Sequence, residues 1–305
     1  MRKIVIALGG NALLQRSEEP TYANQHKNIK RTASVIAKHI KNCELVITHG
    51  NGPQVGDELI RNRYASSRVP PLPLYLLNAE TQALIGSIFE IALQEELGQR
   101  GIEKEIVTVI THVVVDRNDR AFKTLKKQIG PFYNKRELQS ELRKNRFMYV
   151  KTGGLFRRVV PSPRPKEVLE MESIKKLVKA GRYVISGGGG GIPLYRHGRN
   201  LVGVDAVIDK DLTTQLIASA INADTLIILT NVDCVYEKLS DKRSGIKNIK
   251  ASELKKELKK FEEGTMKPKI DACIRFIEKG GNKAYIGNLF KFGDILKGRS
   301  GTEIY

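Results

Sequence analysis

The sequence contains no tryptophan, few aromatic residues and only three cysteines. Aromatic residues make up 6% of the chain and no stacking motif accompanies the basic ones, which argues against a single-strand nucleic-acid-binding protein. The cysteines, at positions 43, 234 and 273, are odd in number and form no CxxC pair. Neither a disulfide framework nor a metal site is therefore expected, and the cytosol is the expected compartment.

Long hydrophobic runs are also missing. No apolar stretch approaches the roughly 20 residues that a membrane span needs, so no contact with a membrane is expected. Residues 1–3 lead directly into a strand pattern, and we expect no signal peptide. There is no GxxxxGK[ST] and no GxGxxG with a following acidic ribose ligand, which excludes a P-loop protein and a dinucleotide-binding motif of the usual kind.

Acidic residues are scarce relative to basic ones. The chain has 52 Lys and Arg against 33 Asp and Glu, a formal charge of +19. Such a charge attracts polyanions, either nucleic acid or nucleotides, although a lysine-rich proteome with solvated helix faces explains it equally well. Residues 255–260, with mixed signs, are typical of such an exposed helix face.

Three short apolar runs, at 4–8, 45–47 and 183–185, each break into a glycine-rich turn. A β-branched run that ends in glycines is typical of a buried strand stopping at one edge of a sheet. Glycine lets the backbone approach an anion with its N–H groups, and a following helix adds its positive end. The turns therefore predict a protein that handles phosphate. The five glycines at 187–191 are interpreted as a phosphate or substrate turn, with a flexible joint as the alternative.

The predicted strands and helices alternate along most of the chain. This order indicates an α/β protein with a mostly parallel sheet and helices on both faces. Thr21 is expected to cap the first helix. Residues 116–166 interrupt the alternation, and 116–151 hold 11 basic and 4 acidic residues, so we expect an inserted subdomain or lid there. The predicted strands are 44–48, 106–110, 183–185, 225–229 and 283–286, and the later helices begin near 53, 76, 205 and 267.

Two lysines stand at unusual positions. Lys210 lies between two carboxylates near the start of a predicted helix, a triplet that is more often an exposed ion pair. Lys269 falls in the first turn of a helix opened by Pro268, where a cation is unfavourable beside the positive helix end. A lysine in that place indicates an anionic partner, although exposed lysines also occur there by chance.

Six blocks of the sequence resemble carbamate kinases, and they run in unbroken order along the chain: 7–13, 48–56, 157–163, 187–193, 204–211 and 301–304. The resemblance implies the amino-acid-kinase fold, a three-layer α/β/α sandwich around a mainly parallel twisted sheet with a small protruding lid. It implies one domain over 1–305. The half at about 1–180, with the lid at about 116–166, would bind carbamate or carbamoyl phosphate, and the half at about 181–305 the nucleotide. A homodimer is also implied.

The resemblance further implies the reaction ATP + carbamate ⇌ ADP + carbamoyl phosphate, with Mg²⁺ bound mainly through the nucleotide phosphates and no protein metal site. Carbamate is already an anion, so the reaction needs gathered positive charge and no general base. One site serves both directions, ATP formation in arginine metabolism and carbamoyl phosphate synthesis. A related kinase with another acid acceptor, or a non-catalytic nucleotide- or nucleic-acid-binding regulator, remains as an alternative function.

The resemblance assigns the site residues. The catalytic ones are Lys127, Lys210, Asp211 and Lys269; the phosphate- and substrate-binding ones are Gly9, Gly10, Asn11, Gly50, Asn51 and Gly52; nucleotide binding is assigned to Asp209, Asp233, Tyr236 and Met266. Many members of the wider superfamily carry a lysine where this chain has Ala7, and carbamate kinases use a lid lysine instead. Lys127 matches that lid lysine, with Lys126 as the alternative. His49 is interpreted as a structural group.

Overall fold

The computed structural model describes residues 1–14, 18–144, 146–238, 240–262 and 264–305. Its centre is an eight-stranded sheet in the order β15-β17-β16-β12-β1-β2-β9-β3. The paired strands are parallel, except for β16 against β17. In that order the strands span Asn248–Ile249, Thr302–Ile304, Lys283–Asn288, Thr225–Thr230, Arg2–Leu8, Cys43–His49, Tyr183–Ile185 and Ile106–Thr108.

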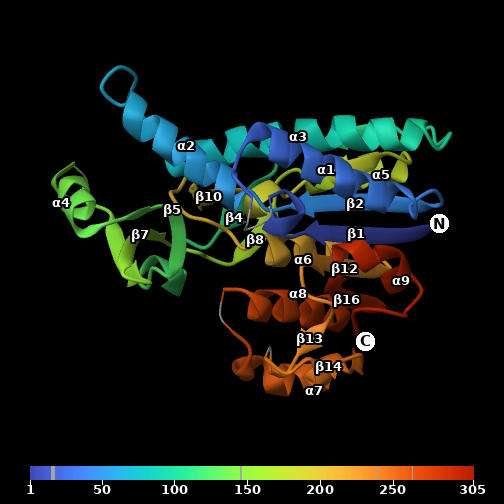
Figure 1. Ribbon diagram of the computed structural model, residues 1–305. Coiled ribbons are helices and arrows are strands. Elements are labelled where there is room, and N and C mark those ends of the chain that lie inside the picture. Colours follow the sequence, from blue (N-terminus) through green and yellow to red (C-terminus); the bar gives the residue numbers. More distant parts are fainter. Residues whose placement is uncertain (15–17, 145, 239, 263) are drawn as a thin grey trace.

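Alternate residues of β1 belong to two separate hydrophobic cores. Ile4, Ile6 and Leu8 pack with α1 (Tyr22–Ala37), α3 (Leu74–Gly98) and α9 (Phe292–Leu296). Val5 and Ala7 pack with the helices of the opposite face, which are α5 (Met171–Lys179), α6 (Lys210–Ala220), α7 (Ala251–Glu257) and α8 (Met266–Glu278). Figure 1 shows α1 and α3 on one side of the strands and α6 and α8 on the other. The predicted three-layer α/β/α fold is confirmed.

Local signals in the sequence explain where several helices begin. Thr21 Oγ1 accepts a hydrogen bond from Asn24 N (3.2 Å) and caps α1, as expected. Pro53 stands in the first turn of α2 (Gly52–Ala65). The helix expected from about 205 begins only at Lys210, because Asp209 caps it and the residues before Asp209 are not helical.

A second sheet of four strands lies beside the first, in the order β11-β10-β4-β8. Its strands span Asn200–Gly203, Ile192–His197, His112–Val115 and Pro165–Val168. The strand expected at 106–110 ends at Thr108, and the chain then enters β4. The five-glycine run is followed by the β10–β11 hairpin and not by an α-helix. The element that follows therefore adds no positive α-helix end to this turn, contrary to the expectation for the glycine turns.

The lid subdomain, defined here as residues 127–160, is a three-stranded antiparallel sheet with one helix. Its strands are β5 (Lys127–Tyr133), β7 (Leu155–Val160) and β6 (Met148–Thr152), and α4 spans Lys135–Lys144. It protrudes from one end of the central sheet (Figure 1). It therefore occupies the middle of the predicted insertion at 116–166.

The segment between β12 and α8 is more structured than its variable, basic sequence indicates. It contains the antiparallel pair of β13 (Val235–Tyr236) and β14 (Gly245–Ile246), as well as β15 and α7. Short 3-10 segments lie at Gly10–Ala12, Arg120–Phe122, Gly188–Gly190, Lys242–Ser244, Leu258–Lys260 and Leu289–Lys291. Over the described part of the chain, the helices are too short or too polar to cross a membrane.

Candidate active site

The first two glycine turns lie side by side at the carboxyl ends of β1 and β2. Leu8 pairs with His49 at the end of the two strands, and Gly50 N donates to Leu8 O (3.1 Å). A Cβ atom on Gly50 would lie 3.6 Å from Gly10 N, so the two turns are in contact. A Cβ on Gly10 or Gly52 would meet open space, which leaves room for a ligand at both turns. The side chain of Asn11 lies outside the described part of the structure.

Lys210 and Lys269 meet at one carboxylate. Lys210 is the first residue of α6 and its ammonium contacts Asp211 Oδ1, while Lys269 Nζ on α8 lies 2.8 Å from Asp211 Oδ2. A Cβ on Gly50 would lie 3.7 Å from Cδ and Cε of Lys210, so the Lys210 side chain lies beside the glycine turns. Five of the predicted residues are therefore brought together: Gly10 and Gly50 from the first half of the chain, and Lys210, Asp211 and Lys269 from the second.

Asp211 is ionised together with Lys210 and Lys269, although all three side chains are largely buried. Its side chain is 3% exposed, and burial alone would raise its pKa, but the attraction of Lys210 and Lys269 holds the pKa well below its usual range. Burial lowers the pKa of Lys210, against the opposing attraction of Asp211. For Lys269, burial is outweighed by Asp211, and the pKa lies above its ordinary value. Two charged lysines thus share one aspartate, which leaves an excess of positive charge.

The lid subdomain contributes a third lysine. Lys127 Nζ lies 3.5 Å from Oδ2 of Asp209, the residue that precedes Lys210. Lys127, the residue that matches the lid lysine of the carbamate kinases, has its ammonium within ion-pair distance of Asp209. We call Lys127, Lys210 and Lys269, together with Asp209 and Asp211, the lysine cluster. Its residues come from β5, from the start of α6 and from the first turn of α8.

Asn51 has a buried side chain that faces away from the open part of its turn. Its Nδ2 donates to Asn78 Oδ1 and to Thr81 Oγ1 (2.9 Å), and Asn78 Nδ2 donates to Gly191 O (2.6 Å). The amide of Asn51 is therefore occupied by α3, and its turn offers backbone N–H groups. Sequence reasoning missed Asn78 and Thr81; the available signal was polar side chains at helical spacing within the mostly apolar helix 76–98.

The five-glycine run is a packing element. Residues 187–191 are buried, and a Cβ on Gly189 would lie 2.2 Å from Asn51 Nδ2, while one on Gly190 would lie 2.2 Å from Ile208 O. Thr213 Oγ1 on α6 also donates to Gly190 O (2.8 Å). The run thus fits tightly between the second glycine turn and the segment that leads into α6. Packing alone explains the absence of side chains here, and the phosphate or substrate turn stays a prediction.

His49 is held at the base of the same turn. Its Nδ1 lies 3.1 Å from Gly50 O, and burial lowers its pKa to about 4, so the ring is neutral at pH 7. Thr48 Oγ1 lies 2.6 Å from Thr214 Oγ1, which donates to Lys210 O (2.6 Å). These buried polar contacts fasten the end of β2 to the first turn of α6, beneath Lys210.

The residues assigned to the nucleotide lie on several elements. Asp209 belongs to the lysine cluster through its contact with Lys127. Asp233 follows β12, accepts from Asn288 Nδ2 (3.0 Å) and pairs with Lys291 (2.9 Å). Tyr236 lies on β13, and Met266 begins α8 and packs against the second core. Met266 shares the first turn of α8 with Lys269.

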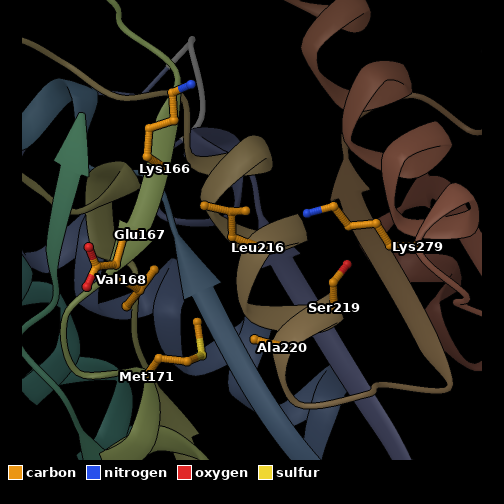
Figure 2. Close-up of a pocket in the computed structure, with 8 residues that line it drawn as sticks. All are labelled: Lys166, Glu167, Val168, Met171, Leu216, Ser219, Ala220 and Lys279. Carbon is orange, nitrogen blue, oxygen red and sulfur yellow. The ribbon is translucent and has the colours of Figure 1, made fainter. Parts of the chain in front are cut away.

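A cavity lies elsewhere in the second half of the chain. It has a volume of about 510 Å³ and lies between β8, α6 and the end of α8, lined by Lys166, Met171, Leu216, Ser219 and Lys279 among others (Figure 2). Its lining residues are not those of the lysine cluster, and Leu216, the lining residue of α6 that is nearest in sequence to Lys210, lies six residues beyond it, roughly 9 Å along the helix. Among the described residues, no group of three or more His, Cys, Asp and Glu side chains could hold a metal ion.

Comparison with known proteins agrees with this arrangement. Residues 2–288 match the model of the amino acid kinase family. The chain is 43% identical to the carbamate kinase of Pyrococcus horikoshii (99% of this chain, 98% of that protein) and 43% identical to that of Haemophilus influenzae (99% and 96%). Its structure matches that of carbamate kinase from Giardia lamblia bound to AMP-PNP, with a TM-score of 0.92, 38% identity and coverage of 99% and 98%. The chain therefore belongs to the amino acid kinase family and, within it, to the carbamate kinases.

Proposed function

We propose that this enzyme transfers a phosphoryl group between ATP and carbamate, giving ADP and carbamoyl phosphate, and that it works in both directions. The observation that carries the proposal is the lysine cluster beside two open glycine turns. The carbamate kinases to which the chain is similar over almost its full length support the choice of substrate.

The chemistry explains why cations suffice. ATP and carbamate are both anions, and the transferring phosphoryl group spreads charge over its three equatorial oxygens. Catalysis then consists of holding the two anions in line and stabilising that charge. Because carbamate has no proton to lose from its attacking oxygen, the transfer needs no general base, and the neutral and buried His49 is interpreted as a structural group.

Four of the five residues of the lysine cluster receive a role in the transfer. Lys210 and Lys269 bind the transferring phosphoryl group and the β–γ bridging oxygen, and Asp211 fixes the spacing of the two ammonium groups. Lys127 closes over the site from the lid subdomain. The backbone N–H groups of residues 10–11 and 51–52 donate to phosphoryl and carbamoyl oxygens, the second pair with the positive end of α2 behind it. The N–H groups of Gly9 and Gly50 instead donate to Leu229 O and Leu8 O.

Mg²⁺ would be held mainly by the nucleotide, not by the protein. Both carboxylates of the cluster are occupied: Asp211 by two lysines, and Asp209 by Lys127 and by Asp211 N. The ion, when bound, offsets charge on the β- and γ-phosphates.

A homodimer is part of the proposal, and α3 supports it. Leu84 and Ile91, seven residues apart on this helix, are 40% and 56% exposed. That spacing places them on one face, two turns apart. Tyr64, Val69 and Leu72, in the neighbouring α2 and the loop after it, are exposed too. An apolar surface of this kind is typical of a subunit interface.

We also place the enzyme in the cytosol. Cys43, Cys234 and Cys273 are all free thiols, and Cys43 and Cys273 are buried. This usage is typical of a reducing compartment.

The proposal is tested by supplying carbamoyl phosphate and MgADP and measuring ATP. The wild-type protein and Lys256→Ala, which changes an exposed lysine of α7, should both form ATP. Lys210→Ala should form it about 10²–10³ times more slowly, because a pre-placed charge is lost. A folded wild-type protein that forms no ATP would exclude the proposed reaction.

A further inference from the structure

Asp209 uses its two carboxylate oxygens for two different contacts. Oδ1 accepts a hydrogen bond from Asp211 N (3.0 Å) and caps α6. Oδ2 lies 3.5 Å from Nζ of Lys127, a residue 82 positions earlier in the chain. The same side chain thus ends the loop before the active-site helix and reaches the lid subdomain.

The Lys127–Asp209 pair is more open to solvent than the pairs at Asp211. The side chains of Lys127 and Asp209 are 33% and 16% exposed, whereas those of Lys269 and Asp211 are 16% and 3% exposed. An ion pair of intermediate exposure is weaker than a buried one, and its partners exchange more easily. Lys127 can therefore leave Asp209 for a phosphate oxygen, while Lys210 and Lys269 stay fixed by Asp211.

The base of the lid subdomain is attached separately by apolar and backbone contacts. Ile129 and Val160 pack with Val55 and Leu74, and Val207 N, two residues before Asp209, donates to Pro161 O (3.0 Å). These contacts fix where the lid joins the body. They do not fix the ammonium group of Lys127, which ends a long, flexible side chain. The position of that group depends on its contact with Asp209.

We propose that Asp209 is a positioning residue that holds Lys127 over the phosphoryl-transfer site until a substrate phosphate takes its place. The inference rests on the proposed function, in which Lys127 acts on the transferring group. Because a misplaced catalytic group loses most of its effect, loss of the Asp209 charge should lower kcat more than it raises KM for the nucleotide.

Asp209→Asn separates the two roles of Asp209, because asparagine caps a helix as well as aspartate does but carries no charge. We expect kcat to fall about tenfold while the unfolding midpoint in urea stays that of the wild type. Asp294→Asn is the matched control: it removes an exposed ion pair with Arg299, and kcat should not change.

A double-mutant cycle distinguishes positioning from direct action on the substrate. If Asp209 acts through Lys127, adding Asp209→Asn to Lys127→Ala should lower kcat no further, within about twofold. Losses that multiply, or a wild-type kcat in Asp209→Asn alone, would overturn the proposal.

Hydrogen exchange tests the contact without substrates, and so independently of the reaction. In Asp209→Asn, backbone amides of the Lys127–Tyr133 strand should exchange about two to five times faster, as expected when a partly exposed ion pair is lost, while those of α6 keep their rates. Unchanged exchange in β5 would also overturn the proposal. If the wild-type protein forms no ATP but β5 exchange does rise, the proposed reaction is wrong and the contact stands.

Discussion

Lys269 and Asp211 form an ion pair of 2.8 Å across the space between α6 and α8, although they are 58 positions apart in the chain. Since Asp211 also holds Lys210, this one contact fixes two cations at the point where a phosphoryl group would pass. Asp211 thus acts through its lysine neighbours.

Asp211→Asn should disable the enzyme and destabilise it. The substitution keeps the shape of the side chain but leaves two largely buried ammonium groups without their shared counter-charge. We expect turnover to fall about 10²–10³-fold and the free energy of unfolding to fall by about 3 kcal/mol. Urea unfolding and an ATP-formation assay measure the two effects. Wild-type stability in this variant would show that the buried charges are compensated elsewhere.

The alkaline limb of the pH–rate profile should report Lys210. Its pKa lies below the ordinary lysine value of 10.5 because of burial, whereas that of Lys269 lies above it because Asp211 outweighs burial. As pH rises, Lys210 therefore loses its proton before Lys269 does. The site then has one positive charge fewer, so kcat should fall at a pH below 10.5. Lys210→Arg, whose charge persists, should move this limb upward. A limb that stays in place would assign it to another group.

Lys127→Ala should lower turnover at least tenfold while the protein stays folded. Lys126→Ala, the matched control one residue earlier, should keep turnover within about twofold of the wild type, because the proposed role belongs to Lys127, whose ammonium pairs with Asp209. Initial rates at saturating substrates and a circular dichroism spectrum check both variants. The opposite order of effects would transfer the role of the lid lysine to Lys126.

Gly189→Ala should be strongly destabilising for a reason unrelated to phosphate. The new Cβ would lie 2.2 Å from Asn51 Nδ2, at a residue whose φ is +61°. Overpacking and the left-handed backbone together should cost about 3 kcal/mol. Gly198→Ala is the control, because its φ is +60° with nothing within 4 Å, and it should cost only about 1 kcal/mol. Equal losses in urea unfolding would show that packing adds nothing at Gly189.

A charged face on α3 should separate the subunits. Replacing Leu84 and Ile91 by glutamate puts like charges into the proposed interface, so light scattering should give the mass of a monomer. Leu142→Glu, on the lid subdomain and 53% exposed, should leave a dimer. If the double variant keeps the dimer mass, the interface lies elsewhere.

The sequence predicts the main strands and helices of the central fold well, because patterns of neighbouring residues determine where they begin and end. β-branched runs ending at glycine correspond to β1, β2 and β9, and Thr21 and Pro53 mark the first turns of their helices. The β10–β11 hairpin and the small strands between β12 and α8 were not predicted, because short strands are stabilised by their partners in the fold more than by their own residues.

The candidate active site can be predicted only in part from the sequence. The triplet at 209–211 and the lysine beside Pro268 are visible as unusual, yet topology alone brings α6, α8 and β5 together. The glycine run is ambiguous for a physical reason: a phosphate turn and a tightly packed turn both require the absence of Cβ. The contacts of Gly189 with Asn51 and of Gly190 with Ile208 explain the run by packing, and they come from residues distant in sequence.

The most direct test of the account is a crystal structure of the enzyme with Mg²⁺ and AMP-PNP. We expect the Nζ atoms of Lys210 and Lys269 at about 2.7–2.9 Å from oxygens of the terminal phosphate, with Asp211 still between them. Ammonium groups directed into solvent, away from that phosphate, would contradict the claim that these lysines stabilise the transferred group.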